Sequence, residues 1–364
     1  MKPKENNIGF LRLILASFVI IGHAPEMLDG DRSREPLTVI FHTVSLGELA
    51  VDGFLVLSGY LITQSFTRSP TILDYAIKRF ARIFPGYIVA YAASVFVLGP
   101  LVGARPQDHL VPTLINAIFL QPPIPYDGQF PGMSSYPFLN GSLWTIAYEA
   151  RFYVLIGILG SCNLLTKKFV LGLTALSLIV GIANANVAVQ HFLNHPPLLW
   201  RFAGIYELCF GYNSQTARLL PSFLCGATAF LWRDELFRRL NRMSAGLCSL
   251  IAVGLMYRNP YLAMPGLVTF GGAALLWLAW QANLGALGRI NRNWDISYGC
   301  YLYGWPIGTY IRWQFPDITP AILIVMSLPL SFFFGAVSWW LVEQPARRRI
   351  FGRLMKTQQP HMAL

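Results

Sequence analysis

Apolar runs long enough to cross a bilayer recur along almost the whole chain, and this feature constrains the fold most strongly. The hydrocarbon core of a bilayer is about 30 Å thick, which requires about 20 mostly apolar residues in a helix. Of the 364 residues, 54% are hydrophobic and only 12% are charged, whereas about 25% are charged in a typical soluble domain. We therefore predict an all-α, polytopic membrane protein.

Ten membrane-spanning helices are predicted from these runs. The runs at 218–232 and 244–257 are short for a span. The apolar stretch 198–213 is interrupted by Arg201, Glu207 and glycines, which favours an interfacial or re-entrant segment. The predicted spans are 8–25, 44–66, 84–104, 142–161, 168–188, 218–232, 244–257, 261–281, 297–315 and 319–342.

The basic residues predict the orientation of these spans. If the N-terminus is cytoplasmic, 19 of the 28 Lys and Arg residues fall in cytoplasmic segments, 7 fall in outer segments, and Arg12 and Arg151 lie within spans. Cytoplasmic loops of membrane proteins carry such an excess. We therefore predict one domain over 1–364, with a membrane core over 8–342 and a basic cytoplasmic tail over 343–364. The net charge of +11 then points to membrane lipids and not to nucleic acid as a partner.

Two further features bound the function. The five cysteines are odd in number, form no CxxC pair and lie mostly in apolar runs, which is typical of small packing residues and predicts no disulfide framework and no metal site. The longest outer loop, about 105–141, is rich in proline, glycine and aromatic residues. A loop of this length is suited to cover an outward-facing site.

The first predicted span contains two ionisable residues, Arg12 and His23, in the run "FLRLILASFVIIGHAP". An ionisable side chain within the bilayer costs about 2.5–3.5 kcal/mol on insertion scales, so it usually faces protein or a water-filled cavity. A helix rises about 1.5 Å per residue, which separates the two residues by about 16 Å. One helix thus marks two depths of a pathway. The structural alternatives are that Arg12 extends to the inner headgroups and that His23 is an interfacial residue.

Other polar residues lie in or beside the next three spans. Asp52 and Ser58 occur in "DGFLVLSGYLIT", whose glycines have close helix packing as their structural explanation. Arg79 and Arg82 are spaced to share one helix face at the cytoplasmic mouth of the third span, where positive-inside charge is the structural alternative. Glu149 lies in the fourth span within "GSLWTIAYEARFY", and a buried pair with an arginine is its structural alternative.

Taken together, these segments resemble the acyltransferase 3 family of integral membrane acyltransferases, which includes bacterial O-acetyltransferases acting on O-antigen, exopolysaccharide and Nod-factor sugars. Arg12 and His23 are similar to its Arg-x10-His pattern. The other matches follow in chain order: VDxFFxLSGFLIT at 51–63, RxxRxxPxY at 79–87, SLWTxxxExxFY at 142–153, ISYxxYLxHxP at 296–306, and the family's usual ending at 342–349.

The chain departs from the family pattern at three positions. Gly53 and Leu55 replace bulkier apolar or aromatic residues, and Gly304 stands where many members have a histidine. Any family role of that histidine is therefore absent here. The hydrolase-like extracellular domain fused to some members is also not expected.

The resemblance implies acetyl-CoA as the acyl donor on the cytoplasmic side and a carbohydrate hydroxyl as the acceptor on the outer side. Arginine forks bind phosphate well, so Arg79 and Arg82 are expected to hold the donor phosphates. Arg12, which lies deeper, is expected to contact the pantetheine–pyrophosphate region or to act as a catalytic residue that stabilises charge. The donor site is expected to include Ser58 and Tyr87 as well. The acceptor would be an exopolysaccharide, an O-antigen or a lipid-linked oligosaccharide repeat unit.

In the implied reaction, His23 acts as the general base that deprotonates the acceptor hydroxyl. Glu149 is expected to orient His23 or another member of the site. Asp52 and Trp144 are expected to contact the acceptor, and Ser58 or Trp144 is a candidate donor to the oxyanion. Direct transfer and a relay through an acyl-histidine both remain open.

Two other classes of function compete with this enzyme of the bacterial inner membrane. A transporter or flippase for lipid-linked glycans would also have many spans with intramembrane Arg, His and Glu, but it has no need of the ordered family motifs. A membrane scaffold without enzymatic activity would explain the small residues in the helices and would leave the buried charges without a purpose.

Overall fold

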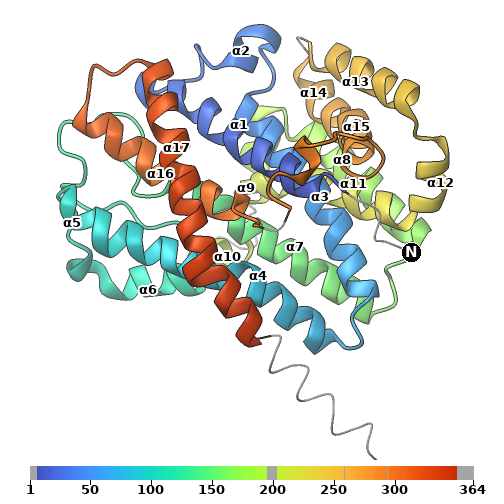
Figure 1. Cartoon of the computed structure of the whole chain (residues 1–364), viewed down its shortest axis with the longest axis horizontal. Coiled ribbons are helices and arrows are strands. Elements are labelled where there is room, and N and C mark those ends of the chain that lie inside the picture. Colours follow the sequence, from blue (N-terminus) through green and yellow to red (C-terminus); the bar gives the residue numbers. More distant parts are fainter. Residues whose placement is uncertain (1–5, 195–202, 258, 293, 351–364) are drawn as a thin grey trace, which may run out of the picture.

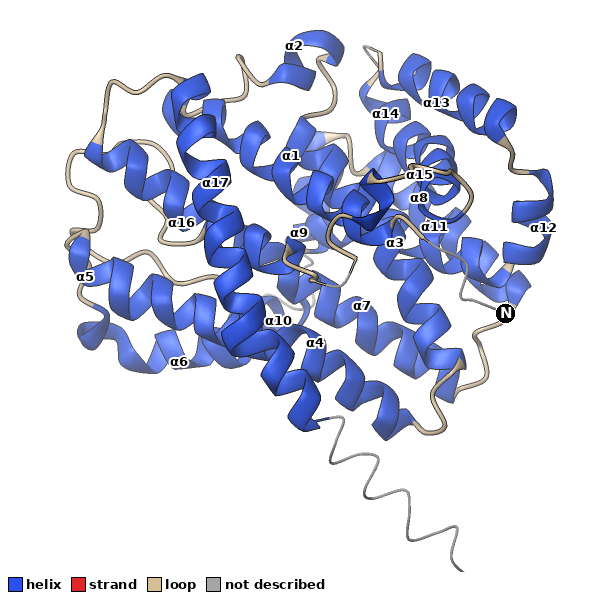
Figure 2. Cartoon of the chain, in the orientation of Figure 1, coloured by secondary structure: helices blue, strands red, loops and turns tan. Residues whose placement is uncertain are grey.

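The computed structural model describes residues 6–194, 203–257, 259–292 and 294–350. All regular structure in these ranges is helical (Figure 2), which confirms the predicted all-α class. In chain order, the elements are α1 Ile8–Asp29, α2 Pro36–Phe41, α3 Leu46–Thr67, α4 Ile72–Ala92, η1 Ala93–Leu98, α5 Gly99–Leu101, η2 Pro106–His109, α6 Leu110–Ile118, η3 Gly141–Leu143, α7 Trp144–Ser161, α8 Lys167–Ala183, α9 Val187–Asn194, α10 Ala203–Phe210, α11 Asn213–Leu231, α12 Arg233–Arg239, α13 Arg242–Met256, α14 Pro260–Gly266, η5 Leu267–Gly271, α15 Gly272–Trp280, η6 Leu287–Arg289, α16 Ser297–Gln314, α17 Pro320–Ser338 and η7 Trp339–Glu343.

Six helical stretches in the described ranges are long and apolar enough to cross a bilayer, or seven if α8 and α9, which meet at an angle of 114°, form one span. The remaining predicted spans coincide with α11, α13 and α16. At least half of the residues in α11 and α16 are buried. Because these two helices contact mainly protein, they do not need the apolar composition of a lipid-facing helix. Each of the ten predicted spans thus coincides with at least one helix. By length and composition, six or seven helical stretches in the described ranges qualify as membrane spans.

Helix α3 packs closely against α11 on one side and against α1 on the other (Figure 1). A Cβ atom on Gly59 of α3 would lie 1.8 Å from the carbonyl oxygen of Phe223 in α11, and one on Gly226 would lie 2.0 Å from that of Val56. On the other side of α3, Gly22 of α1 meets the backbone at Gly47. The small residues in the second span therefore do serve close helix packing.

Two predicted boundaries differ from the structure. The third span was expected to begin at residue 84, but its helix begins at Ile72 and runs through η1 to Leu101. The side chain of Thr71 caps this helix by accepting a hydrogen bond from the Asp74 backbone amide. Arg79 and Arg82 consequently lie inside the helix, where protein groups compensate their charge. At the other end of the chain, the last long helix continues past residue 342 to Ile350, and 351–364 lie outside the described residues.

The predicted long outer loop contains a helix that the sequence analysis did not identify. Helix α6 buries Thr113 and Ala117 and exposes a row of apolar side chains, including Val111 and Ile118, which are 68% and 69% exposed. The loop then returns to η3 and α7 and packs against α16 through a hydrogen bond from Trp305 Nε1 to the Phe138 carbonyl. For the stretch 198–213, the structure describes α10, while 195–202 lie outside the described residues.

Candidate active site

Helix α1 presents Arg12 and His23 to two separate small cavities. Arg12 lines a cavity of about 40 Å³ together with Glu149, and His23 lines a cavity of about 10 Å³ together with Ser142. The helix is continuous between them, so the two residues lie about 16 Å apart along its axis. The structure therefore contains the predicted pair of polar positions on one helix, each beside its own cavity.

At the Arg12 end, two arginines converge on one carboxylate that the sequence analysis did not select. Arg82 Nη2 lies 2.7 Å and Arg12 Nη1 lies 3.4 Å from the same oxygen of Asp295, Oδ2. The other oxygen, Oδ1, accepts a hydrogen bond from Ser297 Oγ at 2.6 Å. Burial raises the pKa of Asp295, but the guanidinium groups of Arg82 and Arg12 lower it more, so this pKa lies below its ordinary value.

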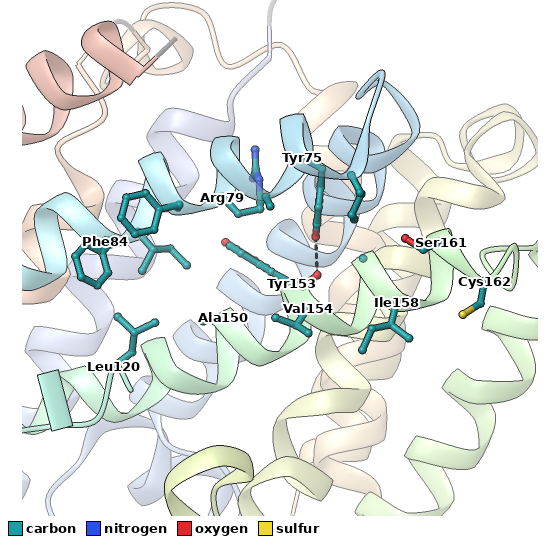
Figure 3. Close-up of a pocket in the computed structure, with 15 residues that line it drawn as sticks. Tyr75, Arg79, Phe84, Leu120, Ala150, Tyr153, Val154, Ile158, Ser161 and Cys162 are labelled. Carbon is teal, nitrogen blue, oxygen red and sulfur yellow. Dashed lines mark hydrogen bonds between the residues drawn. The ribbon is translucent and has the colours of Figure 1, made fainter. Parts of the chain in front are cut away.

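Arg79 has other partners than Arg82, although the two are one helical turn apart. Its Nη2 donates to Ser65 Oγ at 3.2 Å, and its guanidinium lies 5.8 Å from the centre of the Tyr153 ring. Arg79 also lines an apolar groove of about 550 Å³ between α4 and α7 (Figure 3), where Tyr75 Oη donates to the Tyr153 carbonyl at 2.7 Å. Within the described residues, Arg82 and not Arg79 therefore joins Arg12 at a shared carboxylate.

Glu149 lies in the Arg12 cavity and not beside His23. Its Oε1 atom accepts hydrogen bonds from Ser58 Oγ and, at 2.6 Å, from Tyr153 Oη. Ser58 is thus connected to this cavity through Glu149. Glu149 was expected to orient either His23 or another member of the site, and in the structure it contacts Ser58, another predicted site residue.

The carboxylate beside His23 is Glu26, one helical turn further along α1. The distance from His23 Nδ1 to Glu26 Oε2 is 2.8 Å, and Trp305 contacts the imidazole edge-on at a ring-centre distance of 4.9 Å. Because an ionised carboxylate only accepts hydrogen bonds, this contact places the proton of a neutral imidazole on Nδ1. Nε2, which lies near Gly47, then keeps its lone pair and is available to take a proton. The spacing of three residues between His23 and Glu26 was the signal for this pair in the sequence.

Glu26 is the first member of a series of ion pairs that leads away from His23. Arg32 bridges two carboxylates, with Nε 3.1 Å from Glu26 Oε1 and Nη1 3.2 Å from Glu48 Oε1. Burial lowers the pKa of Arg32, but Glu48 and Glu26 together raise it above its ordinary value. The Arg32 charge therefore fixes Glu26 in the position from which it contacts His23.

Asp52, predicted to contact the acceptor, is the far end of this series. Its side chain is only 3% exposed and lies 3.3 Å from Arg218 Nη2, and Ser222 Oγ donates to it at 2.8 Å. Arg218 also lies 3.9 Å from Glu48. The structure therefore gives Asp52 the role of a buried counter-ion that connects α3 to α11, without contact to the His23 cavity.

Tyr87 and Trp144, also predicted as binding residues, lie away from both cavities. Tyr87 is fully buried and donates from Oη to the Gln121 carbonyl at 2.6 Å. Trp144 packs on Tyr148 at 5.7 Å between ring centres, on a face of α7 where Arg151 donates to carbonyls at the end of α10. Arg151 therefore does not form the buried pair with Glu149 that was the structural alternative for this motif.

A tyrosine separates the two cavities. Tyr301 lines the Arg12 cavity, and its hydroxyl lies 2.5 Å from Thr145 Oγ1 and donates to the Ser142 carbonyl at 2.9 Å. Thr145 lines the Arg12 cavity and Ser142 lines the His23 cavity. Both cavities are much smaller than the roughly 300–1,000 Å³ of a typical ligand pocket. Tyr301 and its two hydrogen-bond partners thus connect the linings of the two cavities.

Gly304, one of the positions at which the sequence departs from the family pattern, lines the His23 cavity. A Cβ atom at this position would lie 2.7 Å from Cγ1 of Ile20 in α1. The missing side chain therefore lets α16 approach α1 directly beside His23. As a result, the catalytic candidates at this end are His23 and Glu26 on one helix.

The order of these motifs agrees with a known family. A family profile described as an acyltransferase domain matches residues 5–342. The chain belongs to the acyltransferase 3 family. The match covers both cavities and every candidate site residue described above. This membership makes the protein an acyltransferase, and the apolar helices agree with a multi-pass membrane protein.

Three relatives are similar over most of their length. An "O-acetyl transferase" of Shigella phage Sf6 is 26% identical over 94% of this chain and 96% of the relative. "Nodulation protein 10" of Rhizobium leguminosarum bv. viciae is 27% identical over 94% of both chains. "Acyltransferase MdmB" of Streptomyces mycarofaciens is 26% identical over 87% of this chain and 84% of the relative. No solved structure gives a significant match.

Proposed function

We propose that this acyltransferase transfers an acetyl group from acetyl-CoA, bound at the Arg12 end of α1, to a sugar hydroxyl bound at the His23 end. The observation that carries the proposal is the different chemistry of the two ends. Two arginines converge at one end, and an imidazole held by a carboxylate lies at the other. The relative named as an O-acetyl transferase supports acetyl as the group transferred.

The Arg12 end suits the donor because CoA carries several phosphate groups. Guanidinium groups bind phosphate through two parallel hydrogen bonds, with charge assistance. Arg12 lines the Arg12 cavity, and Arg82 reaches the same Asp295 oxygen as Arg12, so phosphates held there would direct the pantetheine arm along α1 towards Tyr301. The excess of Lys and Arg in the segments on this side supports its assignment to the cytoplasm of a bacterial inner membrane.

The His23 end suits the acceptor because a sugar hydroxyl must lose its proton to become a good nucleophile. In direct transfer, His23 Nε2 accepts this proton while the hydroxyl oxygen attacks the thioester carbonyl carbon. When the tetrahedral intermediate collapses, the carbon–sulfur bond breaks. The sulfur receives the proton from the imidazolium, and CoA leaves as a thiol. In the relay, His23 Nε2 would itself attack the thioester carbonyl carbon, and the carbon–sulfur bond would break to release CoA as a thiolate. The sugar hydroxyl would then attack the acyl-imidazole, which restores the free imidazole, and the hydroxyl proton would pass to the thiolate.

The acceptor we propose is a bacterial surface carbohydrate, either an exopolysaccharide, an O-antigen or its lipid-linked repeat unit. The aromatic loop that follows α6 supports this class, because Tyr136 contacts Trp305 beside His23 at 6.2 Å between ring centres. Aromatic faces of this kind pack well against the apolar faces of sugar rings.

The experiment compares surface polysaccharide from a strain lacking the gene with polysaccharide from strains restored with wild type or His23→Ala. Proton NMR should show O-acetyl signals with wild type and none with His23→Ala, because the base is missing. His109→Ala removes an exposed imidazole elsewhere in the chain and serves as the matched control. Full acetylation by an equally abundant His23→Ala protein would rule out the assignment of the base.

A flippase for lipid-linked glycans is the competing function. It is distinguished by purified protein in lipid nanodiscs with radiolabelled acetyl-CoA and deacetylated polysaccharide. An acyltransferase releases CoA and labels the polysaccharide in this mixture, while a flippase does neither.

A further inference from the structure

Beside the Arg12 cavity lies a charge arrangement that phosphate binding by itself does not explain. Asp295 lies in the segment before α16 and already occupies the position where the arginines of α1 and α4 meet. Arginines from two helices far apart in the sequence, α1 and α4, thus meet at a single oxygen atom of a third segment, Asp295 Oδ2. Arg347, beyond η7, adds a third positive charge that favours the ionised carboxylate.

The contact between Arg82 and Asp295 is close but badly aligned. Arg82 Nη2 is 2.7 Å from Asp295 Oδ2, yet this buried nitrogen atom makes no hydrogen bond of acceptable geometry. A buried guanidinium N–H without an aligned acceptor is unfavourable. An incoming oxyanion with several oxygens and free choice of orientation would satisfy this N–H better than Asp295 does.

Asp295 is held so that only one of its oxygens is committed to a neutral partner. Oδ1 accepts from Ser297 Oγ at 2.6 Å, while Oδ2 faces the arginines. A carboxylate and a phosphate oxygen would compete for the same guanidinium face, because each needs the same two donors. If one replaces the other, Asp295 can turn away while it keeps its contact with Ser297.

We propose that Asp295 is a resident competitor of the donor phosphate: it neutralises Arg12 and Arg82 when the site is empty and returns to them when CoA leaves. This inference rests on the proposed function, since it takes CoA to be the donor. It adds a residue that sets how tightly CoA is held and how readily the product dissociates. Asp295 is a positioning residue and does not contact the reacting atoms.

The test measures CoA binding by titration calorimetry with the full chain in lipid nanodiscs. Asp295→Asn keeps the size of the side chain and the acceptor for Ser297 but removes the competing charge. We expect it to bind CoA about tenfold more tightly than wild type, which corresponds to about 1.4 kcal/mol. Pantetheine, which lacks phosphate, should bind wild type and variant equally.

Glu235→Gln is the matched control, because Glu235 forms an exposed ion pair with Lys167 away from the Arg12 cavity. It should leave CoA binding unchanged. An Asp295→Asn protein that melts like wild type but binds CoA equally or more weakly would overturn the inference and make Asp295 a structural brace. If Asp295→Asn does not fold, Asp295→Ser must show the same gain in affinity, and its failure to do so refutes the inference as well.

The failure of this inference is distinguishable from failure of the proposed function. If wild type binds CoA and Arg82→Ala weakens that binding, the donor assignment stands whatever Asp295→Asn does. If wild type binds neither CoA nor acetyl-CoA, the donor assignment fails and the role of Asp295 fails with it.

Discussion

Replacing Glu26 with glutamine tests how His23 is made ready for catalysis. The contact of 2.8 Å between His23 Nδ1 and Glu26 is a hydrogen bond to a charged group, and such bonds contribute about 1.5–3 kcal/mol. Since each 1.36 kcal/mol corresponds to a factor of ten in rate, Glu26→Gln should lower kcat by about ten- to hundredfold. The glutamine amide can also donate to Nδ1, which would favour the tautomer that leaves Nε2 without its lone pair.

The assay is acetyl transfer from labelled acetyl-CoA to deacetylated polysaccharide by protein in nanodiscs. The KM for acetyl-CoA should change less than about threefold, because Glu26 lies about 20 Å from Arg12 along α1. Glu26→Asp, which keeps the charge, should recover part of the rate. Asp29→Asn is the control, since Asp29 pairs with an exposed arginine, Arg34, and exposed pairs contribute little. A Glu26→Gln protein with wild-type kcat would refute the proposed positioning of His23, whereas a raised KM with unchanged kcat would place Glu26 in substrate binding.

Two further predictions follow from the positions of the arginines and glycines. Arg82→Ala should raise the KM for acetyl-CoA about tenfold or more. Arg79→Ala should raise this KM less, because Arg79 hydrogen-bonds Ser65 and does not contact the shared carboxylate. Equal effects of the two variants in the same assay would contradict this difference. Gly59→Ala should destabilise the protein by about 1–3 kcal/mol or more, because its Cβ would lie 1.8 Å from a carbonyl oxygen of α11. A thermal melt of Gly59→Ala beside Gly172→Ala, where no atom lies within 4 Å of the added Cβ, measures this, and equal melting temperatures would contradict the packing argument.

The sequence predicts the helical class and the position of most helices because spanning a bilayer imposes a length and a composition that are visible in any window. It predicts α4 less well, because Arg79 and Arg82 have the pattern of loop charges. Their burial depends on Ser65, Tyr153 and Asp295, which are distant in the sequence. Charge compensation across such distances cannot be inferred from a local window.

The candidate site could be predicted in part for the same reason. Arg12 and His23 stand out because both lie in one apolar run, and the structure places each beside a cavity. Glu26 follows directly after the predicted end of that run and has the pattern of a loop residue, although it contacts His23 one turn away. In contrast, Tyr87 and Trp144 belong to recognisable motifs, yet their side chains serve packing and backbone hydrogen bonds.

The hydroxyl of Tyr301, held between Thr145 and the Ser142 backbone, has a consequence for the cell as a whole. A protein that hands an acyl group across a membrane must not let protons or ions follow it, because the electrochemical gradient would dissipate. On the proposed function, Tyr301 would keep the two sides insulated at rest, because its hydroxyl bridges the linings of the two cavities. The proposed transfer would then require Tyr301 to move away only for the length of one turnover, and the membrane would stay sealed for the rest of the time.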